Sequence, residues 1–219
     1  MPRILITGAN RGLGLEFARQ YSAEGWDVVA TARETSPELD ALGIRVESLD
    51  MSDLEAVAGF GQRLDALDLL IANAGTYGPK QCDSAGDALG WGETFTVNTI
   101  APYLLARSVL PLVEQSRGKL IAISSKMGSI DDNGSGGYLA YRTSKTALNS
   151  AWHNLALDVR RSGVIAAVLH PGWVKTRMGG SSAPLKPEQS VAGMRRVIEQ
   201  LGSDGSGGFF NYDGAEIPW

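Results

Sequence analysis

The stretch LITGANRGLG, residues 5–14, decides the fold, because an apolar run leads into three glycines and then a helical pattern. Gly8 permits a tight turn, Gly12 lets a phosphate group approach the backbone, and Gly14 lets helix and strand pack closely. The free N–H groups and positive dipole end of the helix would bind a pyrophosphate. No Gly-Lys-Ser/Thr follows, which excludes a Walker-type phosphate loop. The stretch therefore predicts a dinucleotide-binding turn.

Short apolar runs alternate with helical patterns along the whole chain. The runs expected as strands cover residues 3–7, 27–32, 44–49, 67–72, 119–124, 164–169 and 208–212. The expected helices cover 12–24, 52–64, 87–114, 138–161 and 187–201. Several runs are apolar nearly throughout, which is typical of strands covered on both faces. We therefore expect an α/β protein: a single domain over 1–219 with a doubly wound (Rossmann) parallel sheet of about seven strands and helices on both faces.

Composition narrows the class of partner. The formal net charge is −4 and Lys and Arg form no stripe, so neither nucleic acid nor an anionic membrane is expected to bind. The single cysteine, Cys82, allows no intrachain disulfide, and His153 and His170 are too far apart to suggest a metal site. The sequence has neither a signal-peptide pattern nor an apolar stretch of membrane-spanning length, so a cytoplasmic protein is expected.

The residues after the second expected strand bear on the choice of cofactor, because an acidic side chain there would bind the ribose and select NAD. Here a positive charge stands at this position instead. Arg33 stands directly after VVATA, and Glu34 comes only after it. A guanidinium can form a planar fork to a 2′-phosphate, and Arg11 in the glycine turn could supply a second charge. The pattern favours NADP over NAD as the cofactor.

Two tyrosines, Tyr138 and Tyr141, precede the lysine in YLAYRTSK (138–145). Positions i and i+4 share a helix face, so Tyr141 meets Lys145, while Tyr138 meets Arg142. A neighbouring ammonium lowers the pKa of a phenol, which is ordinarily about 10. We expect Tyr141 to be a proton donor tuned by Lys145, with Arg142 as the competing cation. Tyr138 is expected to be a wall or helix-start residue.

Together these residues resemble the short-chain dehydrogenase/reductase family. The matching motifs are TGANRGLG (7–14), NAG (73–75), VNTIAP (97–102), ISSKMG (123–128), YRTSK (141–145) and HPGWVKT (170–176). Three further stretches are similar to the compact branch of the family that contains C-factor-type signalling proteins and sniffer-type carbonyl reductases. They are SSKMGSI (124–130), GGYLAYRTSKTALN (136–149) and YDGAEIPW (212–219). The resemblance implies an NAD(P)-dependent oxidoreductase that reduces a carbonyl or oxidises an alcohol by hydride transfer.

The resemblance also implies the roles of individual residues. The catalytic set would be Asn98, Ser125, Tyr141 and Lys145. The family spacing to Gly128 selects Ser125 to orient the substrate carbonyl, with Ser124 as the alternative. Asn98 would hold a water that links Lys145 to solvent.

The cofactor would lie along the ends of the strands. The expected contacts are Gly8, Asn10, Arg11, Gly12, Leu13, Gly14, Arg33, Asp50, Met51, Asn73, Ala74, Gly75, Tyr141, Lys145, Pro171, Gly172, Val174 and Thr176. Asp50 would accept from the adenine amino group, although it and Ser52 could equally cap a helix. Residues 73–75 would flank the adenine ribose, and residues 171–176 would meet the nicotinamide. Trp173 would line the pocket or belong to the core, and His170 is expected to be structural.

A second class of function stays open at this point: a C-factor-type signalling or redox-sensing protein that binds the nucleotide with little turnover. Relatives of the family usually pair through the helices expected at 87–114 and 138–161, so a homodimer is expected, with a tetramer as the alternative. The substrate depends on the loops at 76–95 and 177–187, which no motif describes.

Overall fold

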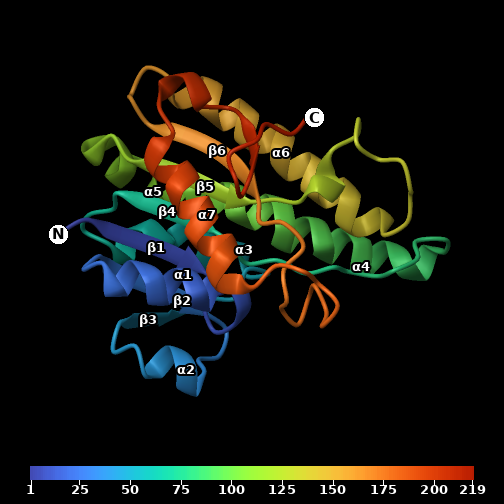
Figure 1. Cartoon of the computed structure of the whole chain (residues 1–219), viewed down its shortest axis with the longest axis horizontal. Coiled ribbons are helices and arrows are strands. Elements are labelled where there is room, and N and C mark those ends of the chain that lie inside the picture. Colours follow the sequence, from blue (N-terminus) through green and yellow to red (C-terminus); the bar gives the residue numbers. More distant parts are fainter.

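One parallel sheet of seven strands runs through the molecule in the order β3-β2-β1-β4-β5-β6-β7 (Figure 1). The computed structural model describes residues 1–219. The strands are β1 (Arg3–Thr7), β2 (Asp27–Ala32), β3 (Arg45–Ser48), β4 (Leu69–Ala72), β5 (Lys119–Ile123), β6 (Ile165–His170) and β7 (Phe209–Asn211). All neighbouring strands are parallel. The expected fold class, a doubly wound sheet of about seven strands, is confirmed.

Helices cover both faces of the sheet (Figure 1). They are α1 (Gly12–Ala23), α2 (Pro37–Asp40), α3 (Leu54–Gly59), α4 (Ala85–Phe95), α5 (Ala101–Ser116), α6 (Leu139–Val159) and α7 (Pro187–Gln200). Side chains alternate along each strand, so Leu5 packs into the core shared with α3, α5 and α6. Ile4 and Ile6 pack into the other core, with α1 and α7. This two-sided burial explains why the strands read as continuous apolar runs.

The helix expected at 87–114 is divided. A π-helical turn, Thr96–Ile100, separates α4 from α5, with Asn98 fully buried inside it. The π turn changes the backbone hydrogen bonding over only five residues of a helical stretch, and the broad helical pattern does not reveal it. Such turns are frequent at functional sites, and this one carries a predicted catalytic residue.

The start of α6 also differs from the expectation. Tyr138 precedes the helix in the left-handed conformation, with φ of 50°. It is therefore a helix-start residue, one of the two roles expected for it. Between β2 and β3 the chain forms only the four-residue helix α2, because the connection is too short for a full crossover helix.

The parallel strands bring their carboxyl ends to one edge. β1 pairs with β2 on one side and β4 on the other, so successive strands are added toward one edge of the sheet up to β3 and toward the opposite edge from β4 on. Ligands of such sheets bind at this switch point. The loops after β1, β4, β5 and β6, which carry most of the predicted site, all leave the sheet here. None of the helices is both long and apolar enough to cross a membrane.

Candidate active site

The glycine turn after β1 has the close approaches that its glycines predict. Gly8 has φ of +66°, and a Cβ there would lie 3.0 Å from the Cα of Ala74. A Cβ on Gly14 would collide with the carbonyl oxygen of Gly8. Arg11 stands at the N-cap of α1 without a side-chain capping bond, so the first N–H groups of the helix stay available. The turn therefore fits a dinucleotide pyrophosphate.

Asn73 holds this turn from the neighbouring strand end. Its Nδ2 donates to the carbonyl oxygens of Thr7 and Gly8, at 2.9 and 3.3 Å. The Oγ1 of Thr7 accepts from the backbone N–H groups of Asn73 and Ala74, both at 3.0 Å. The Asn73 side chain is thus hydrogen-bonded to the glycine turn. Any contact between residues 73–75 and a ribose would be made by other atoms of this loop.

Gly75 leads from this loop toward the predicted catalytic set. A Cβ on Gly75 would lie 3.2 Å from Oδ1 of Asn98 and 3.7 Å from Nζ of Lys145. A side chain at Gly75 would therefore crowd the Asn98 oxygen and would touch the Lys145 ammonium group.

Arg33 and Asp50, two predicted cofactor contacts of opposite charge, follow the ends of β2 and β3. Arg33 is exposed directly after β2, and Nδ2 of Asn10 donates to the carbonyl oxygen of Glu34 at 3.0 Å. Oδ1 of Asp50 accepts from the N–H and hydroxyl of Ser52, at 2.9 and 2.8 Å. These bonds, helped by the charge of Arg33, lower the pKa of Asp50 against the opposing effect of its partial burial. Arg33 and Asp50 thus influence each other electrostatically.

Neither residue considered as a helix cap in this region has that role. Asp53 caps α3, because its Oδ1 accepts from the N–H of Ala56 at 3.0 Å. Met51, expected to touch the cofactor, packs its side chain into the core at 5% exposure, which leaves only its backbone for a contact. Leu13 is partly buried against the core of α1 and α7.

Tyr141 and Lys145 lie one turn apart on α6, and both are buried. Nζ of Lys145 is 6.0 Å from the centroid of the Tyr141 ring and donates to the carbonyl oxygen of Ile123 at 2.8 Å. Burial lowers the pKa of Lys145 to about 8. Burial also raises the pKa of Tyr141, with a smaller contribution from Tyr77, while Ser125 works in the opposite direction. Desolvation disfavours the charged form of each group, so it raises the pKa of the phenol and lowers that of the ammonium. The expected lowering of the phenol pKa by Lys145 is therefore absent.

The two adjacent serines after β5 point to different environments. Oγ of Ser125 accepts from the N–H of Met127 at 3.1 Å and lies beside Tyr141. Oγ of Ser124 donates to Oδ1 of Asn149 at 2.5 Å inside the core. Alternation at the strand end thus directs only Ser125 toward Tyr141.

Both polar atoms of the Asn98 side chain, Oδ1 and Nδ2, form hydrogen bonds within the protein. Oδ1 accepts from the N–H of Thr76 at 2.8 Å, and Nδ2 donates to the carbonyl oxygen of Thr76 at 2.7 Å. Nδ2 also donates to Oγ of Ser144 at 3.0 Å. The reading of Asn98 as an amide bonded to backbone is therefore correct.

Tyr77 belongs to the site, although no sequence signal marks it. Its ring centroid lies 4.6 Å from that of Tyr141 and 5.7 Å from that of Tyr138. Arg142, considered as a competing cation, instead donates from Nε to the carbonyl oxygens of Gly136 and Gly137, both at 3.1 Å. Tyr77 thus occupies a flank of Tyr141, and Arg142 is engaged with the loop before α6.

The segment after β6 folds back over the glycine turn. A Cβ on Gly12 would lie 3.5 Å from the methyl group of Thr176, so the two motifs face each other. Gly172 has φ of +81°, Val174 is buried and paired with Leu185, and the carbonyl oxygen of Pro171 accepts from Ser190 at 2.6 Å.

Trp173 lies within this segment but outside the core. It is 56% exposed, and its Nε1 donates to the carbonyl oxygen of Gly179 at 2.8 Å. The core reading of Trp173 is therefore wrong. Its exposed ring belongs to the loop that follows β6, on the side of the sheet edge where the cofactor motifs meet.

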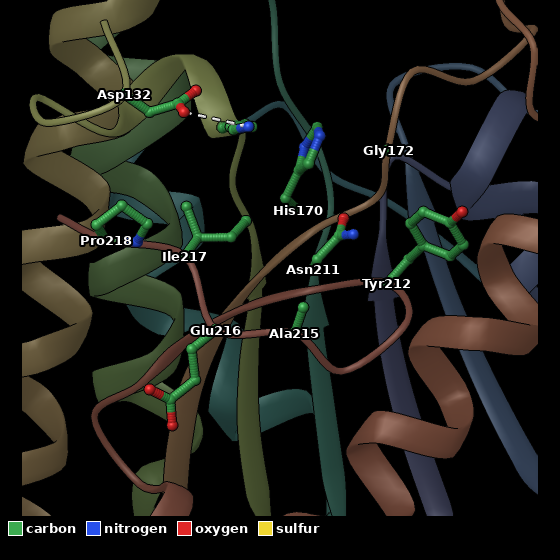
Figure 2. A pocket seen from close by; sticks show the side chains of 10 residues that line it. Asp132, His170, Gly172, Asn211, Tyr212, Ala215, Glu216, Ile217 and Pro218 are labelled. Carbon is green, nitrogen blue, oxygen red and sulfur yellow. Dashed lines mark ion pairs between the residues drawn. The ribbon is translucent and has the colours of Figure 1, made fainter.

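His170 borders a hollow of about 310 Å³ (Figure 2). Lys126, Asp132, Asn211 and Tyr212 line it as well, and Nζ of Lys126 pairs with Asp132 at 3.2 Å. Nδ1 of His170 is buried without a partner, and burial lowers the pKa of this imidazole to about 4. The predicted cofactor contact Gly172 lines the hollow, whereas none of the predicted catalytic residues does, and the structural role expected for His170 stays a prediction.

Metal ligands and a cysteine thiol are two further kinds of group that could take part in chemistry. No group of His, Cys, Asp or Glu side chains in the structure is arranged to hold a metal ion. Cys82 is a free, partly buried cysteine.

A dinucleotide-binding turn beside a buried tyrosine–lysine pair defines the class of nucleotide-dependent oxidoreductases. The chain belongs to the short-chain dehydrogenase family, whose family model matches residues 2–186. It is accordingly an NAD(P)-dependent dehydrogenase or reductase, as the sequence motifs predict.

Known proteins similar to this chain include both kinds of relative that the motifs suggest. C-signal of Myxococcus xanthus is 42% identical over 154 residues, covering 70% of this chain and 93% of the relative. The carbonyl reductase Sniffer of D. melanogaster has 34% identity and a TM-score of 0.92, with full coverage of both chains. An NADPH-bound carbonyl reductase from chicken fatty liver has 33% identity and a TM-score of 0.89, covering 100% of this chain and 99% of the other.

Proposed function

We propose that this protein is an NADP-dependent oxidoreductase that reduces a carbonyl compound, or oxidises the corresponding alcohol, with Tyr141 as proton donor or acceptor. The observation that carries the proposal is the gathering of Tyr141, Ser125 and Lys145 beside the glycine turn. Similarity to the carbonyl reductases of fly and chicken supports a carbonyl substrate.

The residues of the cofactor edge fit a dinucleotide. The glycine turn and the free N–H groups of α1 would hold the pyrophosphate, and Thr176 would close over it. Lys145 would bond the nicotinamide ribose hydroxyls, with Pro171, Gly172 and Val174 beside the nicotinamide. NADPH, when bound, supplies the hydride.

Arg33 supports the choice of NADP. It is exposed beside Asp50 at the end of β2, where a 2′-phosphate would lie, and Arg11 stands at the N-cap of α1. The chicken carbonyl reductase, similar over the whole chain, is described with NADPH bound.

The chain's own residues would perform the proton transfer. Ser125 would donate to the substrate carbonyl and orient it, and the Tyr141 hydroxyl would give the proton that the reduced oxygen needs. Burial keeps Tyr141 protonated, which suits a donor. Lys145 would stabilise the phenolate left behind, and Asn98 would hold the loop and helix that surround the pair.

The substitution Tyr141→Phe tests the proposal. It removes only the hydroxyl, so turnover should fall by about 10²-fold or more while NADPH binding stays nearly intact. Tyr103→Phe on α5 is the control for loss of a tyrosine hydroxyl elsewhere. Steady-state kinetics on a panel of carbonyl compounds and calorimetric titration with NADPH provide the measurements. Unchanged turnover in Tyr141→Phe would exclude the mechanism.

A second candidate function is a nucleotide-binding signalling or redox-sensing protein with little turnover. The 42% identity to C-signal supports it. The two candidates differ in turnover: tight NADPH binding without reduction of any compound in the panel would favour the sensor. The buried Tyr141–Lys145 pair favours the enzyme, because binding alone needs no proton donor.

The assembly and location are also proposals. We propose a homodimer formed through α5 and α6, with a tetramer as the alternative, and a cytoplasmic location in keeping with the single free cysteine. Exposed apolar side chains near these helices, Ile100 and Leu157, would be covered by the pairing. Sedimentation of the purified protein as a monomer would exclude the dimer.

A further inference from the structure

The ring of Tyr77 lies against the ring of Tyr141. Their centroids are 4.6 Å apart and the planes are inclined by 57°, a favourable arrangement for an aromatic pair. Tyr77 is itself half-buried, and burial raises its pKa. It comes from the loop after β4, whereas Tyr141 comes from α6. The contact is therefore a tertiary one that closes a flank of Tyr141.

The loop that carries Tyr77 is held on both sides of this residue. Before it, both backbone groups of Thr76 bond the amide of Asn98 at 2.8 and 2.7 Å. After it, Gly78 has φ of +67° and lies so close to Thr94 that a Cβ would collide with its hydroxyl oxygen. The Thr94 hydroxyl donates to the carbonyl oxygen of Gly90 at 2.7 Å and is thus fixed on α4. Tyr77 consequently has little freedom to leave Tyr141.

The same asparagine also reaches the helix side of Tyr141. Nδ2 of Asn98 donates to Oγ of Ser144, and that hydroxyl donates to the carbonyl oxygen of Tyr141 at 2.8 Å. Asn98 therefore ties together the loop that presents Tyr77 and the helix turn that presents Tyr141. Because this amide is fully buried and both its oxygen and its nitrogen are hydrogen-bonded, the connection is rigid.

We propose that Tyr77 is a positioning residue for Tyr141: its ring holds the phenol in place and excludes water from one flank, and the Asn98–Thr76 bonds keep it there. This inference rests on the proposed function and deepens it. The groups that face Tyr141 are Lys145 on its own helix, Ser125 after β5 and Tyr77 after β4, with Tyr138 behind Tyr77. Of these, only Tyr77 covers the ring with apolar surface from another element.

The experiment compares Tyr77→Ala with the conservative Tyr77→Phe. Phenylalanine keeps the ring, so kcat and the ionisation of Tyr141 should stay near those of the parent protein. Alanine opens the flank to water, so kcat should fall about 10- to 100-fold through misplacement of the donor, with a smaller change in KM. Tyr141 should also ionise at lower pH in Tyr77→Ala, because water stabilises the phenolate.

The ionisation is measured without any substrate. Phenolate absorbance is titrated in each protein and in its Tyr141→Phe counterpart, and the difference isolates Tyr141. Tyr138→Ala, which removes a ring that touches Tyr77, should shift this titration less. Thermal unfolding checks that each variant is folded, and Tyr77→Leu replaces the alanine variant if that one is not.

Either of two results would overturn the inference, as would the Tyr138 result below: Tyr77→Ala with parental kcat and Tyr141 ionisation, or equal losses in Tyr77→Phe and Tyr77→Ala. A shift in Tyr138→Ala as large as that in Tyr77→Ala would also overturn it. Failure of the proposed function is distinct, because it appears as absent turnover in the parent protein. In that case the Tyr141 titration still decides the role of Tyr77.

Discussion

Asn98 binds both backbone groups of Thr76 with the two ends of its side-chain amide, at 2.8 Å for Oδ1 and 2.7 Å for Nδ2. The first residue sits in the π turn between α4 and α5, and the second in the loop after β4. This pairing joins a helix interior to a loop that leaves the sheet edge. It explains why a polar side chain is fully buried there, since both the oxygen and the nitrogen of the amide have hydrogen-bond partners.

Replacing Asn98 by alanine should therefore reduce stability as well as activity. Thr76 and Ser144 would lose their partner, and we expect the free energy of unfolding to fall by about 2–3 kcal/mol. Urea denaturation measures the change. The control is Asn154→Ala, because Asn154 is exposed on α6 and bonds only within its own helix. Equal stability of the two variants would contradict a structural role for the Asn98 amide.

Ser125 and Ser124 should separate catalysis from folding. Ser125→Ala removes a donor beside Tyr141, so kcat for carbonyl reduction should fall by about 10²-fold with little loss of stability. Ser124→Ala leaves Asn149 without its 2.5 Å bond in the core, so stability should fall by about 1–2 kcal/mol while kcat changes less. Kinetics and denaturation of both variants test the assignment, and the reverse pattern would give the catalytic role to Ser124.

Arg33→Asp should reverse the choice of cofactor. Loss of a charged hydrogen bond to the 2′-phosphate, and a carboxylate in its place, should weaken NADPH binding by about 10- to 100-fold and NADH binding far less. Arg161→Asp, an exposed arginine just beyond the far end of α6, makes the same change in net charge away from the site. Titration of each variant with both nucleotides gives the comparison. Equal weakening of NADPH and NADH would show that Arg33 does not contact the phosphate.

Acid should destabilise the protein through His170. Its pKa in the folded protein is about 4, depressed mainly by burial and secondarily by Lys126, against about 6.5 in an unfolded chain. A depressed folded pKa means that the unfolded state binds the proton first. The contribution to stability is therefore present above about pH 6.5 and lost as the pH falls toward 4, by up to about 3 kcal/mol.

The measurement is the difference in unfolding free energy between the parent protein and His170→Gln across this range. Glutamine does not titrate, so the variant should lose less stability on acidification than the parent does. His153→Gln, at an exposed position on α6, is the control for removing a histidine. Parallel acid profiles of parent and His170→Gln would contradict the burial effect.

Much of the fold was predictable because its signals are local. Strands buried on both faces require continuous apolar runs, and helices with one buried face require a period near 3.6, so the seven strands and most helices follow from the residues themselves. The interruption of the helix expected at 87–114 did not follow. The π turn at Thr96–Ile100 contains Asn98, whose side chain bonds Thr76 in a different segment, and such a long-range contact leaves no local pattern.

The sequence by itself determined the dinucleotide turn at Gly8, Gly12 and Gly14 and the pairing of Tyr141 with Lys145, because both depend on spacing within one element. Only the tertiary structure directed Ser125 to Tyr141 and Ser124 to Asn149, and only it brought Tyr77 against Tyr141. These contacts join segments far apart in the chain. Their geometry depends on how strands, loops and helices pack at one edge of the sheet, which no local pattern specifies.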